Sequence, residues 1–476
     1  MSLNYCDLLV VGSDLSGVIA STLLAKRGMN VLVLDHESEE DRNPNLLTGL
    51  NSRAFKSLLG KLMIPDSKTN ILQENPISYQ VIFPKHRLDV SPSQPFFIKE
   101  IGREFPQDVE VVQALLGEVQ ELREKFLTPL FTQLPIVHPS EKKQFIKWFR
   151  TFPDQKIKDL WAKASPITQT FLKAHLRFLS RGPLMDPLTF QILLFLSPEG
   201  GTTFSVRGGM RELKKIFFEK LDYFGGMVHP LGQDSMDVLV NFREVKGVQL
   251  GRYNFPTRCR YLLGNLDIQN LYQGVPSTLF SRWHKSKIMH MARHEGNGIV
   301  QYLIARDYLP EPLKDNAVII NDPTQPLSGL NYLELNLQAL PRPLDDYDTL
   351  LTVHYLLPAD TLHEETIYFE NLHEQIEQRC LALFPFAKGH MKKVFPVVKQ
   401  EEDLFPEQKD FGEFKNFLSN RATYAPSLFG PSLTSSFKNL FTLGPNVLDW
   451  LGTEGKMLSA MKGVNLIWEK ELKKRS

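Results

Sequence analysis

Length, composition and charge place the chain among ordinary globular proteins. Of its 476 residues, 42% are hydrophobic and 23% are charged, which excludes a disordered or fibrous class. The 55 Lys and Arg residues nearly balance the 54 Asp and Glu residues. The chain therefore lacks the surplus of positive charge that nucleic-acid binding requires. Three cysteines without C-x-x-C spacing indicate neither a disulfide framework nor a zinc site. We expect a reducing, cytoplasmic location, with no signal peptide before the first apolar run and no membrane-spanning segment.

The first thirty-five residues predict a strand, a tight turn, a helix and a second strand. The apolar runs Cys6–Val11 and Val31–Asp35 flank the turn Gly12-Ser-Asp-Leu-Ser-Gly17 and a helix that ends at Gly28. A βαβ unit of about thirty residues that ends in an acidic residue is typical of dinucleotide binding. In such units the turn brings a pyrophosphate to a helix N-terminus, and the acidic residue binds a ribose hydroxyl.

Asp14 departs from this pattern. It occupies the position of the middle glycine in G-x-G-x-x-G, where the absence of a side chain lets the backbone approach the pyrophosphate. The residue adds bulk and negative charge beside the expected diphosphate. The sequence therefore predicts the nucleotide-binding fold more firmly than it predicts the nucleotide.

The next part of the chain is predicted to be mostly helical. A loop over 36–45 leads into a helix over 46–59, and residues 79–90 read as two short strands around a Pro-Lys-His-Arg turn. Apolar residues at helical spacing predict a helix over 108–126. Further helices, separated by prolines, are expected to about residue 198.

Residues 142–150 alternate basic and bulky apolar side chains. The favoured interpretation is a lid helix whose lysines extend over a core-facing side. The alternative is a peripheral contact with a membrane surface.

The second half of the chain mixes strands and helices. A glycine turn at 208–209 precedes a helix over 213–224, and strand patterns occupy 237–250, 260–265, 318–320 and 350–355. A helix over 365–383, a strand over 440–444 and a helix that begins near Gly455 complete the chain. The histidines at 284, 290 and 294 are interpreted as a polar surface, and His354 as a core residue. No catalytic base and no metal site is identified.

The predicted fold class is α/β with an α+β second part. A Rossmann-like FAD/NAD(P)-binding domain is expected from residues 1–75, 200–270 and 420–476. A discontinuous substrate domain, with a mixed sheet, covering helices and a helical lid, is expected from 76–199 and 271–419.

Four stretches in this order resemble the phytoene desaturase and flavin amine oxidase superfamily of FAD-dependent oxidoreductases. They are Asp7–Asp35, Glu104–Val109, Val206–Leu213 with Phe224–Val228, and Asn439–Gly444 with Gly452–Ser459. The resemblance implies FAD as cofactor. It also implies hydride transfer to the flavin from a C–C, C–N or C–O bond of an apolar small molecule.

The resemblance also implies roles for particular residues. It places the turn residues Gly12, Ser13, Asp14, Ser16 and Gly17 at the pyrophosphate, Asp35 at the adenosine ribose, Val228 at the adenine, Arg42 in a loop over the diphosphate, and Gly444, Gly455, Lys456 and Met457 toward the flavin. Besides Asp14, three positions depart from the family. Pro445 follows Gly444 where a carboxylate is usual, the single Gly49 follows Arg42 where a glycine pair is usual, and Lys456 replaces a small residue.

A flavin-free binding protein is the second hypothesis. The Rab GDP-dissociation inhibitors and escort proteins share this scaffold without FAD and bind prenylated partners, so the fold alone does not decide. In this hypothesis the helical region 126–200 would bind an isoprenoid, a prenyl group or a lipidated protein. A third hypothesis is a nucleotide with a smaller phosphate, and NAD(P) is less favoured.

Overall fold

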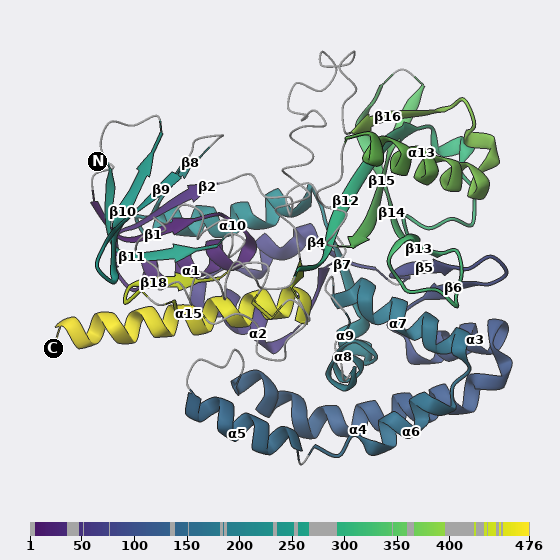
Figure 1. Ribbon diagram of the computed structural model, residues 1–476, viewed down its shortest axis with the longest axis horizontal. Helices are drawn as coiled ribbons and strands as arrows, with labels where there is room; N and C mark the ends of the chain where they lie inside the picture. Colours follow the sequence, from purple (N-terminus) through teal and green to yellow (C-terminus); the bar gives the residue numbers. More distant parts are fainter. Residues whose placement is uncertain are drawn as a thin grey trace.

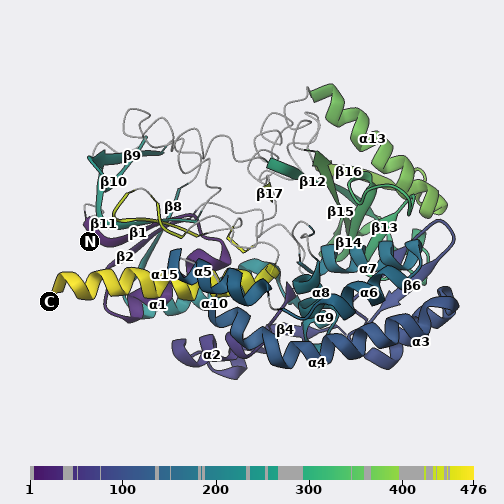
Figure 2. The ribbon, with the colours of Figure 1, turned by 60° about the horizontal axis from the view of Figure 1, so that its bottom comes forward.

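The computed structural model describes two large sheets joined by a helical layer. The described residues are 5–35, 47–50, 52–75, 77–133, 139–150, 152–180, 184, 188–231, 236–251, 256–265, 293–344, 346–358, 366–395, 423–424, 433–435, 437–443, 447–448 and 451–475. The two sheets lie at opposite ends of the molecule, and the helices α4, α5 and α6 run along one side (Figures 1 and 2). The expected α/β architecture is confirmed.

The first sheet is parallel at its centre. Its strand order is β8-β2-β1-β11, and β18 pairs with the end of β11. These strands are β1 Tyr5–Val11, β2 Val31–Asp35, β8 Met227–Pro230, β11 Thr257–Gly264 and β18 Leu440–Thr442. The antiparallel strands β10 (Glu244–Leu250) and β9 (Met236–Asn241) extend the sheet from the start of β11. The carboxyl ends of all five parallel strands therefore meet at one edge, where ligands bind in open α/β sheets.

Strand β1 is buried on both faces. Leu8 and Val10 pack into the core that contains α1, whereas Leu9 and Val11 pack into a separate core on the other face. This explains why the sequence shows a continuous apolar run there instead of an alternating one. Helices α1 (Leu15–Lys26), α10 (Gly209–Tyr223) and α15 (Gly452–Arg475) cover the first of these faces, with α1 in contact with both others.

A small antiparallel sheet corrects one prediction. Residues Leu47–Thr48 form β3, which pairs with β7 (Thr203–Val206), and β7 also pairs with β4 (Leu72–Glu74). The helix expected over 46–59 begins only at Arg53, as α2 (Arg53–Leu62). It begins there because the Ser52 hydroxyl accepts a hydrogen bond from the Phe55 N–H at 3.2 Å and caps the first turn.

The second sheet is larger and mixed. Its order is β16-β12-β15-β14-β13-β5-β6, and only the β13–β5 pair in this order is parallel among the described strands. The strands are β5 Tyr79–Ile82, β6 Arg87–Val90, β12 Arg293–Ile304, β13 Asn316–Ile320, β14 Gly329–Leu344, β15 Tyr347–Pro358 and β16 Met391–Phe395, and β17 Thr423–Tyr424 pairs with β12. Helix α13 (Thr366–Leu383) covers its outer face (Figure 2).

The helical layer follows the predicted proline punctuation. Pro166 and Pro198 are the first residues of their helices, a position where the missing N–H is not needed. The helices are α3 Gln94–Glu104, α4 Val109–Gln133, α5 Pro139–Arg150, α6 Gln155–Lys163, α7 Pro166–Ser180, α8 Thr189–Phe195 and α9 Pro198–Gly201, with short 3₁₀ turns at Asp66–Ile71, Pro106–Asp108, Arg306–Tyr308 and Pro385–Ala387.

Helix α5 contains the predicted lid segment. Phe145 is buried, and Trp148 stacks on Phe190 with ring centroids 6.1 Å apart. This packing gives the helix a core-facing side, and both the lid role and membrane contact by the segment stay predictions. Within the ranges given above, no helix combines the length and the apolar character that crossing a bilayer requires.

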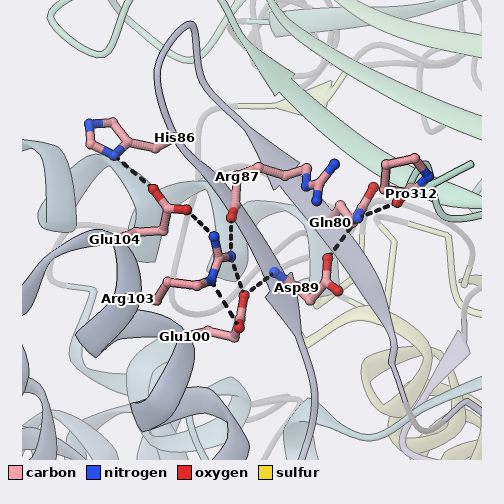
Figure 3. A network of polar contacts seen from close by, with 8 residues as sticks. All are labelled: Gln80, His86, Arg87, Asp89, Glu100, Arg103, Glu104 and Pro312. Carbon is pink, nitrogen blue, oxygen red and sulfur yellow. Dashed lines mark hydrogen bonds and ion pairs between the residues drawn. The ribbon is translucent and has the colours of Figure 1, made fainter. Parts of the chain in front are cut away.

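A polar network fastens the predicted β5–β6 hairpin to α3 (Figure 3). The Arg103 guanidinium contacts the carboxylates of Glu100 and Glu104 and donates to the Arg87 carbonyl. At the other side of the hairpin, the buried Gln80 amide donates to Asp89 at 2.6 Å and to the Pro312 carbonyl at 2.8 Å. Because these groups fulfil one another's hydrogen-bonding needs, we interpret the network as having a structural role.

The three cysteines are buried thiols. Cys6 of β1 lies opposite Cys259 of β11 in the parallel register, and Cys380 of α13 lies in the core between this helix and the second sheet. Burial raises the pKa of the Cys6 and Cys380 thiols to about 12.

Candidate functional site

The turn between β1 and α1 has the backbone that a dinucleotide site requires. Gly12 adopts a φ of +96°, a conformation that favours glycine, and its N–H donates to the Leu34 carbonyl at 3.0 Å. Asp14 is the N-cap residue of α1, and its half-buried side chain does not cap the helix. The first turn of α1 thus begins at the edge where the parallel strands end.

Asp35 lies at this edge, at the end of β2. It is half-buried, and one oxygen of its carboxylate accepts a hydrogen bond from the Ser13 hydroxyl. A carboxylate offers about four acceptor positions. Asp35 therefore retains capacity for a ribose hydroxyl, while Ser13 already holds it in place.

Asn265, which directly follows β11, connects the turn to this neighbouring strand, and no sequence motif marks it. Its side chain donates from Nδ2 to the Asp14 carbonyl at 3.2 Å and accepts at Oδ1 from the Ser16 hydroxyl at 2.8 Å. A Cβ atom on Gly17 would lie 2.3 Å from Nδ2 of this asparagine. Gly17 is thus required for close packing. The available signal was a polar residue directly after a buried parallel strand.

A second group of residues surrounds the start of α15. A Cβ atom on Gly455 would lie 2.3 Å from the Leu448 carbonyl oxygen, so glycine is needed there for a close backbone approach. Lys456 is half-buried and Met457 is fully buried. Glu454, also buried, lies in the first turn of α15, where the helix dipole favours a negative charge.

Two further segments meet α15 at this point. The turn at Gly49, where φ is +74°, faces Glu454. A Cβ atom added to Gly49 would lie 3.3 Å from the Cβ atom of Glu454. At the end of α7, the Leu179 carbonyl accepts from the Thr48 hydroxyl at 3.5 Å, and the Ser180 carbonyl lies beside Gly452. The small sheet, α7 and α15 therefore converge at the position expected to face the flavin.

The structure describes only some of the remaining residues that the sequence singled out. Val228 lies in β8, paired with Val33 of β2, and its side chain is 42% exposed. Arg42, Gly444 and Pro445 lie outside the described residues, as do His284 and His290. His354 is buried in β15, as expected of a core histidine. Within the described part of the chain, no three His, Cys, Asp or Glu side chains form a possible metal site.

His175 of α7 is a buried, neutral imidazole. Its Nε2 lies 3.2 Å from the Phe195 carbonyl, which only accepts, so Nε2 carries the proton. Its Nδ1 consequently accepts from the Tyr79 hydroxyl at 2.7 Å. Burial lowers the pKa of His175 to about 4.

This depressed pKa predicts acid destabilisation. Between about pH 6.5 and pH 4 the unfolded chain binds a proton at this residue and the folded chain does not, so the free energy of unfolding falls as the pH falls. The full effect is about 3 kcal/mol. Urea unfolding across this range should show a weaker pH dependence for His175→Gln than for the unsubstituted chain. His390→Gln, at an exposed position, should keep the original slope, and an equal slope in all three proteins would contradict the assignment.

Comparisons with known proteins show the fold. No family model matches the chain, and no curated protein matches it by sequence. Among solved structures, it is similar to an oxidoreductase from Methanosarcina mazei, with a TM-score of 0.58 and 13% identity over 96% of this chain and 100% of that one. The PF1083 protein from Pyrococcus furiosus gives a TM-score of 0.55 with 15% identity over 97% of each chain. A putrescine oxidase variant with redesigned cofactor binding gives 0.53 with 13% identity, over 98% of this chain and 99% of that one. The chain thus shares the fold of these three proteins along nearly its whole length.

Proposed function

We propose that the chain is a FAD-dependent oxidoreductase in which a hydride passes from an apolar small molecule to the flavin. The observation that carries the proposal is the dinucleotide turn itself. Gly12 at positive φ, the start of α1 and the Asp35 carboxylate lie together at the carboxyl edge of a parallel sheet. The shared fold with an oxidoreductase and with putrescine oxidase supports the same class of reaction.

The residues present fit FAD at both ends of the site. Gly12 and the first N–H groups of α1 would hold the diphosphate, and Asp35 would accept from the adenosine ribose. The first turn of α15, from Gly452 to Gly455, would face the flavin. Bound FAD would supply two-electron oxidation, and the chain would place the substrate and exclude water.

Purified full-length protein tests the proposal by its colour. We expect the visible absorbance of a flavin, and FAD released on heat denaturation in a ratio near one per chain. Gly12→Ala and Gly28→Ala form a matched pair, because both residues have a positive φ but only Gly12 lies at the turn. Gly12→Ala should lose FAD, and Gly28→Ala should retain it.

The opposite outcome identifies the flavin-free alternative. The carboxylate of Asp14 lies at the turn where the diphosphate would bind, and its negative charge disfavours an anionic ligand there. A colourless protein that takes up no added FAD would overturn the proposal. Binding of a prenylated peptide by that protein would establish the carrier function instead.

A further inference from the structure

A pocket opens within the helical layer, away from the dinucleotide turn. It lies among α3, α4, α7 and the α8–α9 segment, and together with the open space at its mouth it measures about 430 Å³. Phe97, Leu116 and Phe195 form apolar walls, and the buried His175 ring completes them. Gln94 and Gln120 also line it, and these two are the less buried of the six residues named here, so we place them toward the opening.

Among the residues that the structure describes, the lining of the pocket is polar in places but carries no ionised group. Both ring nitrogens of His175 are engaged, by the Tyr79 hydroxyl and the Phe195 carbonyl, so the imidazole offers a neutral surface. The other polar lining residues that the structure describes are serines and glutamines. A cation that entered would lose its hydration without meeting a negative partner, which is costly in an apolar site. A hydroxyl or carbonyl group would find the donors and acceptors of the glutamine amides.

Helix α7 links this pocket to the start of α15. His175 faces the pocket, and Leu179, which accepts a hydrogen bond from Thr48 beside α15, follows four residues later. Four residues of α-helix span about 6 Å. On the other side, Gly201 lines the pocket. The chain enters β7 two residues later, and β7 pairs with β3. The pocket therefore adjoins the position proposed for the flavin.

We propose that this pocket binds an uncharged single-ring molecule with one hydroxyl or carbonyl group, and that this is the chemical class of the substrate. The ring would pack among Phe97, Leu116 and Phe195, and the polar group would point to the glutamine amides. The assignment as substrate rests on the proposed function, whereas the binding preference depends only on the pocket. The pocket thus selects neutral molecules over amines of the same shape.

Benzyl alcohol and benzylamine test this preference, because they have the same ring and differ in charge at pH 7. Isothermal titration calorimetry on the full-length protein should show benzyl alcohol binding at least tenfold more tightly than benzylamine. Gln120→Trp, which fills the mouth, should abolish binding of the alcohol. The control Gln113→Trp, at an exposed position of the same helix outside the pocket, should leave it unchanged.

A carboxylate at the mouth should reverse the preference. Gln94→Glu changes no shape and places the acid in the first turn of α3, where the helix dipole tolerates it. This variant should bind benzylamine more tightly than benzyl alcohol. Equal binding of both probes, no binding of either, or retention in Gln120→Trp would overturn the inference. Because these titrations need no flavin, a colourless protein that shows the preference would refute only the proposed function, and a yellow protein without it only the pocket.

Discussion

Replacing Asp14 with Gly raises the affinity of the chain for FAD by at least tenfold. The substitution removes a negative charge and a side chain from the turn where the diphosphate would lie, and tenfold corresponds to about 1.4 kcal/mol. Glycine at an N-cap position costs the helix only about a few tenths of a kcal/mol. Titration of the apoprotein with FAD, followed by quenching of flavin fluorescence, measures the change.

Asp14→Asn separates charge from bulk. Asparagine keeps the size of the side chain and removes its charge, so it should recover most of the gain if electrostatic repulsion is the main obstacle. If bulk is the obstacle, only the glycine variant binds more tightly. An unchanged affinity in both variants would show that Asp14 does not limit FAD binding.

Replacing Asn265 with Ala should lower both stability and FAD affinity. The variant loses the side-chain hydrogen bonds to the Ser16 hydroxyl and the Asp14 carbonyl. It also leaves the buried Ser16 hydroxyl without this acceptor, so the free energy of unfolding should fall by about 2–3 kcal/mol. The turn from Gly12 to Gly17 then loses its side-chain connection to the end of β11. We expect FAD affinity to fall at least fivefold, measured under conditions where the variant is fully folded.

Asn439 supplies the matched control for this experiment. It is also a buried asparagine, and its side chain bonds the backbone of Val245 and Arg260 in the same sheet. It takes no part in the dinucleotide turn. Asn439→Ala should therefore be destabilised by a similar amount and keep its FAD affinity. An equal loss of affinity in both variants would mean that Asn265 acts only through stability.

The sequence was most informative where local pattern and tertiary role coincide. Apolar runs and glycine spacing are typical of a parallel βαβ unit. They therefore predicted the buried strands β1 and β2, the turn at Gly12 and the position of Asp35 at the end of β2. The hairpin over 79–90 could be predicted for a similar reason. The domain boundaries stay a prediction.

What could not be predicted depends on contacts between distant segments. Leu47 and Thr48 read as the start of a helix, but their pairing with β7, more than 150 residues away, makes them a strand. Asn265 carries no motif beyond its place directly after a buried parallel strand, and its importance follows from its hydrogen bonds to Asp14 and Ser16. His175 looks like an ordinary helical residue until Tyr79 and Phe195 occupy both of its nitrogens.

The positions of the cysteines allow unfolding to be followed by the rate at which their thiols are labelled. Cys6 and Cys259 lie side by side in the first sheet, whereas Cys380 lies in the separate core beneath α13. Since only the thiolate reacts readily with alkylating reagents, burial and a raised pKa protect each sulfur until its own core opens. The labelling rates of the two groups therefore record whether the halves of the protein lose their structure in one cooperative step or one after the other.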